Sequence, residues 1–211
     1  MVNFILLNIN MARKYIYING DSYADGDLYL DSPTDCWPYY LIDNNTKVIN
    51  DASAGGSNYR MFRTSVERLV QNPYEYTAAI FVWSQWSRYE TPGSDSYERC
   101  YHNTSEEEIL LENFMTQIKT LEKLCENFGI VCWHVNSIAS PNLDYIKNSL
   151  GKKKISQLID SLDQRKWILP FKTSIRDWGV ENKLEFTKCK HLNAESNRVF
   201  GELVKQKIKI S

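Results

Sequence analysis

The stretch Tyr15-Ile16-Tyr17-Ile18-Asn19-Gly20-Asp21-Ser22 decides the fold class. Its β-favouring residues end in a run of turn formers, so it predicts a strand over 15–18 that leaves its sheet through a tight turn. A serine at such a turn can present its Oγ at the top of the sheet, with its own N–H directed into the same space. The simpler interpretation is that Asp21 or Ser22 only caps the helix that follows.

The alternation of strand and helix patterns continues to the end of the chain. Further strands are predicted over 47–50, 78–83 and 130–135, and helices over 58–71, 106–127, within 142–165 and from about residue 194. The continuous apolar run 78–83 is typical of a central parallel strand covered on both faces. Strands and helices at this spacing predict right-handed crossovers, and therefore an α/β fold, a three-layer sandwich around a central parallel sheet. No repeat or linker divides the 211 residues, so we expect a single domain over 1–211.

Composition excludes several classes of function. A balance of 25 basic and 26 acidic side chains argues against a nucleic-acid binder, which needs clustered Lys and Arg. No apolar run is long enough to span a bilayer, and the opening residues lack the features of a signal peptide, so we expect a soluble cytoplasmic protein. Five cysteines, without a Cys-x-x-Cys pair, predict reduced thiols and no metal site. Met11 offers an alternative start, which would make residues 1–10 an upstream extension; otherwise we expect an edge strand or a dimer contact there.

Parallel sheets bind ligands beyond the carboxyl ends of their strands, which draws attention to the loops 19–26, 51–58 and 84–90. In the second loop, Gly55 and its glycine neighbour let the backbone approach a ligand closely and can point an N–H into a cleft. An ordinary tight turn would also explain them. Asn58 is expected either to cap the next helix or to reach into the site and bind substrate, and we favour the cap.

The third loop follows the most buried strand and is polar and aromatic. Gln85 offers a neutral amide donor of the kind that stabilises an oxyanion. Arg88 is expected either to pair with Glu90 or to meet an anionic group of a substrate, and we favour the ion pair.

Only three histidines are candidates for a general base. His134 lies inside a predicted strand and is expected in the core, and His102 in a polar loop is expected at the surface. His191 comes immediately before the last helix, where an imidazole can lean over the carboxyl edge of the sheet towards the first loop.

In combination these residues resemble the SGNH (GDSL-type) hydrolases, whose members carry a Gly-Asp-Ser block, a glycine block, an asparagine block and a late histidine block. Gly20-Asp21-Ser22, followed by Gly26, corresponds to the first block. Gly55 stands where the second-block glycine would be, and His191 with Leu192-Asn193 looks like the last block.

The resemblance runs from about residue 15 to about residue 205 and implies a flavodoxin-like SGNH hydrolase fold with serine esterase activity. It implies Ser22 as the nucleophile and His191 as the base, with Ser22, Gly55 and Gln85 forming the oxyanion hole. It implies no metal and no organic cofactor. The Trp37-Pro38 pair and the Trp-Ser…Arg-x-Glu string are similar to a phage-encoded branch of the family, which would allow association with a virion.

The chain departs from the family pattern at two positions. Gln85 takes the place of the oxyanion-hole Asn. Lys188 stands three residues before the histidine, where the family has the acid that orients it. Loss of that acid can cost several orders of magnitude in rate. A backbone carbonyl, or a carboxylate from Asp177, Glu181 or Glu185, would have to hold the imidazole instead.

Two main hypotheses follow. The first is a serine esterase that transfers an acyl group from an O-acetylated carbohydrate or a short-chain ester to water. The second is a catalytically impaired binding or structural protein that kept the fold, which Lys188 supports. A nucleotide binder is a weaker third hypothesis, because neither glycine loop has Walker or Rossmann spacing. The pattern leaves the oligomeric state open.

Overall fold

Four parallel strands form the central sheet, in the order β2-β1-β3-β6. They are β1 (Tyr15–Asn19), β2 (Lys47–Asn50), β3 (Tyr76–Trp83) and β6 (Val131–Asn136). The computed structural model describes residues 15–26, 29–86, 88–90, 97–99, 104–139 and 149–208. Each predicted strand is present, and β3 begins two residues before the predicted start. Residues 1–10 and His102 lie outside the described ranges, so the expectations for them stay predictions.

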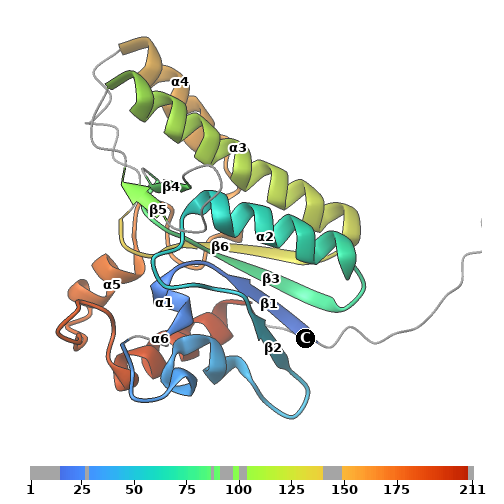
Figure 1. Cartoon of the computed structure of the whole chain (residues 1–211), viewed down its shortest axis with the longest axis vertical. Coiled ribbons are helices and arrows are strands. Elements are labelled where there is room, and N and C mark those ends of the chain that lie inside the picture. The colour runs from blue at the N-terminus through green and yellow to red at the C-terminus, as the bar shows by residue number, and fades with distance from the viewer. Residues whose placement is uncertain are drawn as a thin grey trace, which may run out of the picture.

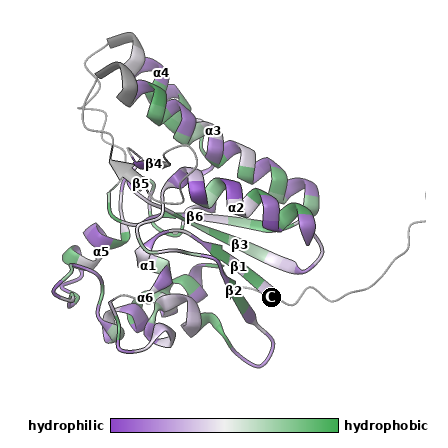
Figure 2. Cartoon of the chain, in the orientation of Figure 1, coloured by the Kyte–Doolittle hydropathy of each residue, from purple (hydrophilic) through white to green (hydrophobic). Residues whose placement is uncertain are grey.

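Side chains alternate across the two central strands and so supply two hydrophobic cores. Ile16 and Ile18 of β1 pack with α6 (Ala194–Ile208) on one face of the sheet. Tyr17 points to the other face, into the core formed with α2 (Asn58–Gln71) and α3 (Thr104–Phe128). Figure 1 shows these helices on opposite sides of the sheet, and Figure 2 shows the strands coloured mainly as hydrophobic. The three-layer α/β prediction is confirmed.

The helices agree closely with the sequence patterns. Helix α2 has the predicted bounds, and α3 begins two residues before the predicted start. The 142–165 segment contains α4 (Ser149–Asp160) and the 3₁₀ turn η4 (Gln164–Lys166). No helix in the described ranges is both long and apolar enough to cross a membrane.

Several short elements were given no range by the sequence patterns, although a helix after Asp21 was expected. They are α1 (Ser22–Asp25), the 3₁₀ turns η1 (Pro33–Asp35) and η2 (Trp37–Leu41), the antiparallel pair β4 (Arg88–Glu90) and β5 (Tyr97–Arg99), and α5 (Ile175–Glu181). Beyond β6, isolated parallel bridges join His134 to Trp167 and Asn136 to Ser174. These bridges carry the chain along the edge of the sheet and place α5 near the carboxyl ends of the strands.

Gly20 is required because the chain passes very close to β3 as it leaves β1. A Cβ added at Gly20 would lie 2.5 Å from Val82 Cβ and 2.6 Å from the Val82 carbonyl oxygen. The backbone of a central strand cannot give way as the end of a flexible side chain can. We therefore expect Gly20→Ala to lower the free energy of unfolding by about 1–3 kcal/mol, the usual cost of overpacking, measured by urea denaturation.

Gly151→Ala is the matched control for this prediction. A Cβ at Gly151 meets only the carboxylate end of the Glu108 side chain, and alanine favours a helix interior more than glycine does. The control should be as stable as the wild type or more so. Equal stability of the Gly20→Ala variant and the wild type would contradict the tight approach.

Candidate active site

Ser22 and His191 meet at the carboxyl edge of the sheet although 169 positions separate them in the sequence. Ser22 Oγ lies 2.8 Å from His191 Nε2. For the hydroxyl to donate to Nε2, the imidazole must be neutral and carry its proton on Nδ1. The structure thus brings the expected nucleophile and the expected base into hydrogen-bond contact.

Ser22 occupies this position because it opens helix α1 directly after the turn that ends β1. Asp21 is the cap of that helix, and its Oδ1 accepts a hydrogen bond from the backbone N–H of Tyr23 at 3.0 Å. Capping by Asp21 and presentation of the Ser22 hydroxyl therefore occur together, and the first does not exclude the second.

His191 is held at the end of a tight turn. The Thr187 N–H donates to the His191 carbonyl at 2.7 Å, and the Lys190 N–H donates to the Thr187 carbonyl at 2.9 Å. Lys190 has a positive φ of 65°, which completes the turn. The hydroxyl of Tyr23 donates to the Lys190 carbonyl at 2.8 Å and so ties this turn to helix α1.

No described carboxylate hydrogen-bonds to the other ring nitrogen of His191. Lys188, at the position where the family has its acid, is exposed. His191 Nδ1 is buried and makes no hydrogen bond of good geometry with any described residue. The backbone of Cys189 favours the charged form of the imidazole. Among the alternatives considered from the sequence, this interaction corresponds to the backbone carbonyl.

The three carboxylates considered as substitutes are engaged elsewhere or exposed. Asp177 closes the capping box of α5, where its Oδ2 accepts from Ser174 Oγ at 2.6 Å. Glu185 accepts from the Asn193 amide at 2.9 Å, and Glu181 is exposed at the end of α5. None of these three carboxylates hydrogen-bonds to His191 Nδ1.

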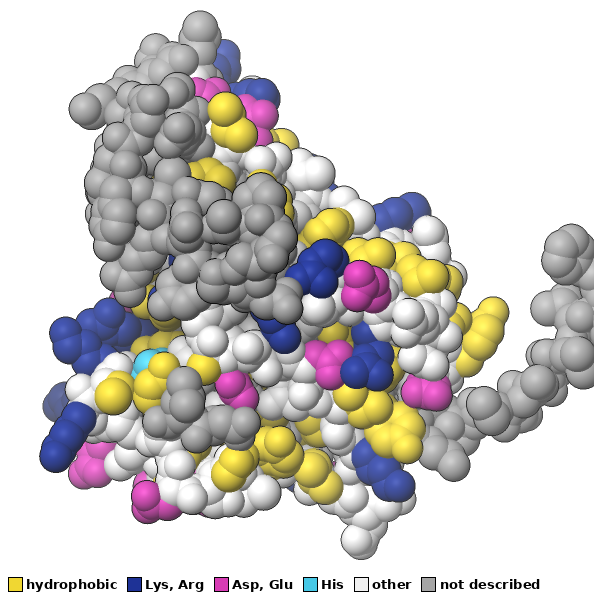
Figure 3. Space-filling model, viewed as in Figure 1, with side chains coloured by type: hydrophobic (Ala, Val, Ile, Leu, Met, Phe, Trp, Pro, Cys, Tyr) yellow, Lys and Arg dark blue, Asp and Glu magenta, His cyan; other side chains and the backbone are white. Residues whose placement is uncertain are grey.

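Burial lowers the pKa of His191 below its ordinary value. The negative charge of Asp21 and the Cys189 backbone oppose this shift, whereas the positive charges of Arg88 and Arg176 add to it. Figure 3 shows Lys and Arg side chains gathered beside the histidine that reaches this face, near α5. The lowered pKa favours the neutral imidazole, which is the form that a general base requires.

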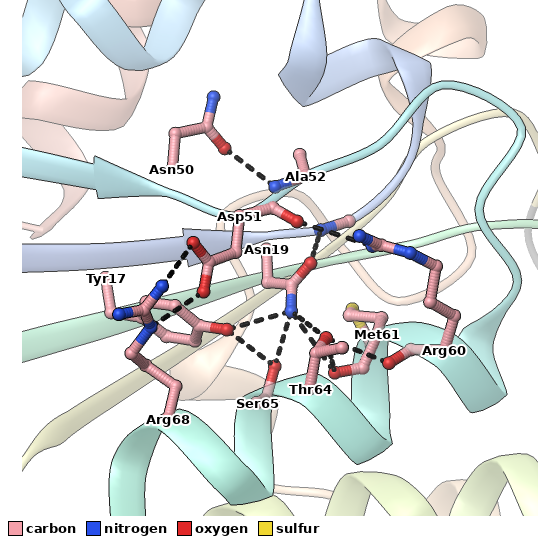
Figure 4. A network of polar contacts seen from close by, with 11 residues as sticks. Tyr17, Asn19, Asn50, Asp51, Ala52, Arg60, Met61, Thr64, Ser65 and Arg68 are labelled. Carbon is pink, nitrogen blue, oxygen red and sulfur yellow. Dashed lines mark hydrogen bonds and ion pairs between the residues drawn. The ribbon is translucent and has the colours of Figure 1, made fainter. Parts of the chain in front are cut away.

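A polar network beneath the first loop anchors it to α2 (Figure 4). The Asn19 side-chain nitrogen lies within 2.8–3.3 Å of oxygens of Tyr17, Met61, Thr64 and Ser65. The Asn19 side-chain oxygen Oδ1 accepts from the Gly20 N–H at 2.8 Å. One buried amide thus fixes the turn that precedes Asp21 and Ser22.

The second loop is joined to the first by its backbone. The Ser53 N–H donates to the Gly20 carbonyl at 3.1 Å. Asp51 is held by a bidentate ion pair with Arg68 of α2, at 2.9 and 3.0 Å. Gly55 has a φ of 76°, a left-handed conformation that glycine adopts more readily than other residues. A glycine at position 55 therefore fits this loop conformation. The loop that contains Gly55 is thus held against the first loop at Gly20.

The expectation that Asn58 caps α2 is wrong. Ser57 is the cap, and its side chain accepts from the Arg60 N–H at 3.1 Å. The buried Asn58 amide pairs instead with the backbone of Ser84, accepting from its N–H at 2.8 Å and donating to its carbonyl at 3.3 Å. Asn58 thus fixes the start of the third loop, where Gln85 is half-buried.

Arg88 is directed inwards. Its Nη1 donates to Ser84 Oγ at 2.8 Å and lies 3.8 Å from Asp21 Oδ2, which also accepts from Ser137 Oγ at 2.7 Å. The Arg88–Glu90 ion pair favoured from the sequence stays a prediction, because the Glu90 side chain is outside the described part of the structure. Arg88 and Ser137 therefore hold Asp21, and with it the turn that carries Ser22.

Several residues of this site were missed by the sequence analysis. Ser137 follows the fourth strand and could have been found by applying the strand-exit rule to that strand too. Helix α5 could have been predicted from the Ser174-x-x-Asp177 pattern, which is a capping-box signal. The rings of Tyr23 and Tyr29, which contact His191, had no local signal. His134 was placed correctly: it is fully buried and accepts from Trp83 Nε1 at 3.0 Å.

This fold is that of the GDSL-type, or SGNH, hydrolases, as comparison with solved structures shows. The psychrotrophic esterase EstA from Pseudoalteromonas sp., crystallised with monoethylphosphonate, matches with a TM-score of 0.54 and 16% identity over 93% of this chain and 97% of its own. The acetyl xylan esterase AlAXEase matches with a TM-score of 0.53 and 11% identity, covering 92% and 99% of the two chains.

A third match is a lipolytic protein of the G-D-S-L family from Desulfitobacterium hafniense, with a TM-score of 0.51 and 14% identity over 92% and 99% of the two chains. At the level of sequence, no protein-family model and no curated protein matches the chain. The comparisons thus establish the fold that the Gly-Asp-Ser and histidine blocks implied, and the function is argued from the site itself.

Proposed function

We propose that this protein is a serine ester hydrolase in which Ser22 is the nucleophile and His191 the general base. The observation that carries the proposal is the 2.8 Å contact between Ser22 Oγ and His191 Nε2, at the sheet edge where α/β folds bind their ligands. A buried serine hydroxyl against a neutral imidazole is the arrangement that nucleophilic acyl transfer requires.

In the first half of the reaction, Ser22 Oγ attacks the carbonyl carbon of the ester while His191 Nε2 takes the hydroxyl proton. His191 then gives this proton to the leaving alcohol oxygen as its bond to carbon breaks, and the acyl group stays on Ser22. In the second half, water attacks the acyl group, His191 takes a proton from it, and Ser22 leaves with that proton. The products are a carboxylic acid and an alcohol.

The oxyanion of each tetrahedral intermediate would be held by three donors, the N–H groups of Ser22 and Gly55 and the side-chain amide of Gln85. The positions of the three strand-exit loops at one edge support this assignment. Each such preorganised donor contributes about 2.7–4 kcal/mol of transition-state stabilisation. The Gln85 side chain is one methylene longer than the Asn that the family has at this place.

The proposed substrate is an O-acetylated carbohydrate or another short-chain ester. One protein of the same fold is an acetyl xylan esterase.

A catalytically impaired binding protein remains the second candidate function. The observation in its favour is the His191 Nδ1 atom, which no described carboxylate approaches within hydrogen-bond distance. Such a protein would bind the same esters without turning them over.

A fluorophosphonate probe separates the two functions, because it reacts only with an activated serine. We expect stoichiometric labelling of the native protein, with the adduct located on the peptide that contains Ser22 by mass spectrometry. Prior unfolding in urea serves as the control and should abolish labelling. A folded protein that takes up no probe, or takes it up at another serine, would contradict the proposed hydrolase.

A further inference from the structure

The imidazole of His191 lies against two tyrosine rings. The ring of Tyr29 stacks on it, with centroids 3.7 Å apart and planes 13° apart. The ring of Tyr23 contacts it at 4.8 Å and 40°. Few positions of the imidazole are compatible with both contacts, so its plane is determined even without a partner at Nδ1.

Tyr23 acts on the backbone of the histidine loop as well as on the ring. Its hydroxyl donates to the carbonyl of Lys190, the residue directly before His191. Burial raises the pKa of Tyr23, which keeps the phenol protonated and able to donate this bond. The loop and the ring are thus held by the same residue.

Little free space surrounds the stacked rings. Ser22, Tyr29 and His191 line one cavity of about 10 Å³, which is room for about one water molecule. The stacked Tyr29 ring therefore blocks any movement of the half-buried imidazole towards its side.

The stack also has an electrostatic consequence during the reaction. When His191 takes the proton of Ser22 it becomes a cation, and the face of an aromatic ring attracts a cation that lies within about 6 Å. Tyr29 would thus favour the imidazolium, which is part of what the carboxylate does in a full triad.

We propose that Tyr29 and Tyr23 position His191 in place of the missing acid: Tyr29 fixes the plane of the imidazole by stacking, and Tyr23 fixes the loop that carries it. This inference rests on the proposed function for its catalytic meaning, and both tyrosines are positioning residues.

Kinetics with an activated ester such as p-nitrophenyl acetate test the stack. Tyr29→Ala should lower kcat by about tenfold to a hundredfold, the cost of a catalytic group misplaced by about 1 Å, with KM changed less than about twofold. Tyr29→Phe keeps the ring and should retain kcat within about twofold of the wild type. An Ala variant with wild-type kcat, or a Phe variant as impaired as the Ala variant, would overturn the proposal.

Nuclear magnetic resonance of the ¹⁵N-labelled imidazoles tests positioning without relying on activity, with signals assigned through His191→Ala. In the wild type we expect one tautomer, protonated on Nδ1. In Tyr29→Ala we expect mixed tautomers and a pKa closer to the ordinary histidine value, because water reaches the ring while Asp21, Arg88 and Arg176 remain. Tyr29→Phe should match the wild type.

The two measurements separate the failure of each proposal. If the wild type lacks esterase activity but its His191 tautomer still depends on the Tyr29 ring, the hydrolase proposal fails and positioning stands. If the wild type is active and neither kcat nor the tautomer responds to Tyr29→Ala, the positioning proposal fails alone.

Discussion

Replacing Ser22 with alanine is expected to lower kcat for p-nitrophenyl acetate by about 10³-fold or more. In a full triad, loss of the nucleophile costs about 10⁶-fold and loss of the acid alone about 10⁴-fold. If nothing replaced the acid here, Ser22 would account for only about the remaining 10²-fold. A larger loss would therefore also indicate that other groups orient His191.

Ser161→Ala is the matched control, because Ser161 is an exposed serine directly after α4 whose Oγ contacts Lys119 Nζ and the Leu158 carbonyl. It should keep wild-type kcat. Alanine at position 22 retains the backbone and the Asp21 cap, so circular dichroism and the urea midpoint should stay close to those of the wild type. A folded Ser22→Ala protein with unchanged kcat would remove Ser22 as the nucleophile.

Replacing His191 with alanine is expected to lower kcat to nearly the same extent as Ser22→Ala. The two groups act as one unit, so the double variant should lose little more than either single variant. The wild-type rate should rise with pH through the pKa of His191, which lies below its ordinary value of about 6.5 because the ring is partly buried. This acidic limb should be absent from the rate of His191→Ala.

Added imidazole provides the control for the second prediction. It should restore part of the activity of His191→Ala, where a cavity replaces the base, and none of the activity of Ser22→Ala. Equal rates for His191→Ala and the wild type on the same ester would instead favour the binding protein.

Much of the framework could be predicted because it depends on local patterns. The β1 sequence, the apolar run of β3 and the helical periodicity of α2 each specify their own secondary structure, and parallel strands then place their exit loops at one edge. Ser22 and Gly55 were selected by this rule, because each lies in a loop at a strand exit, and His191 was selected because it lies just before the last helix.

The roles of polar residues at the edge could not be predicted in the same way. Asn58 is a residue type that commonly caps helices, but Ser57 directly before it is the cap of α2. The Asn58 amide hydrogen-bonds to the backbone of Ser84 instead. Two adjacent residues can both cap this helix. Which of them does so depends on whether the other one hydrogen-bonds to a buried backbone group after a distant strand.

The sequence by itself therefore determined the α/β class, the serine at the first turn, the late histidine and the lack of an acid at Lys188. Only the tertiary structure decided that Tyr23 and Tyr29 lie on the imidazole and that Arg88 turns inwards to Asp21. It also decided that Asp177, Glu181 and Glu185 make no hydrogen bond to Nδ1. Periodicity and turn preference act between neighbours in the chain, whereas contacts between side chains more than 160 positions apart depend on how loops pack after the sheet has formed.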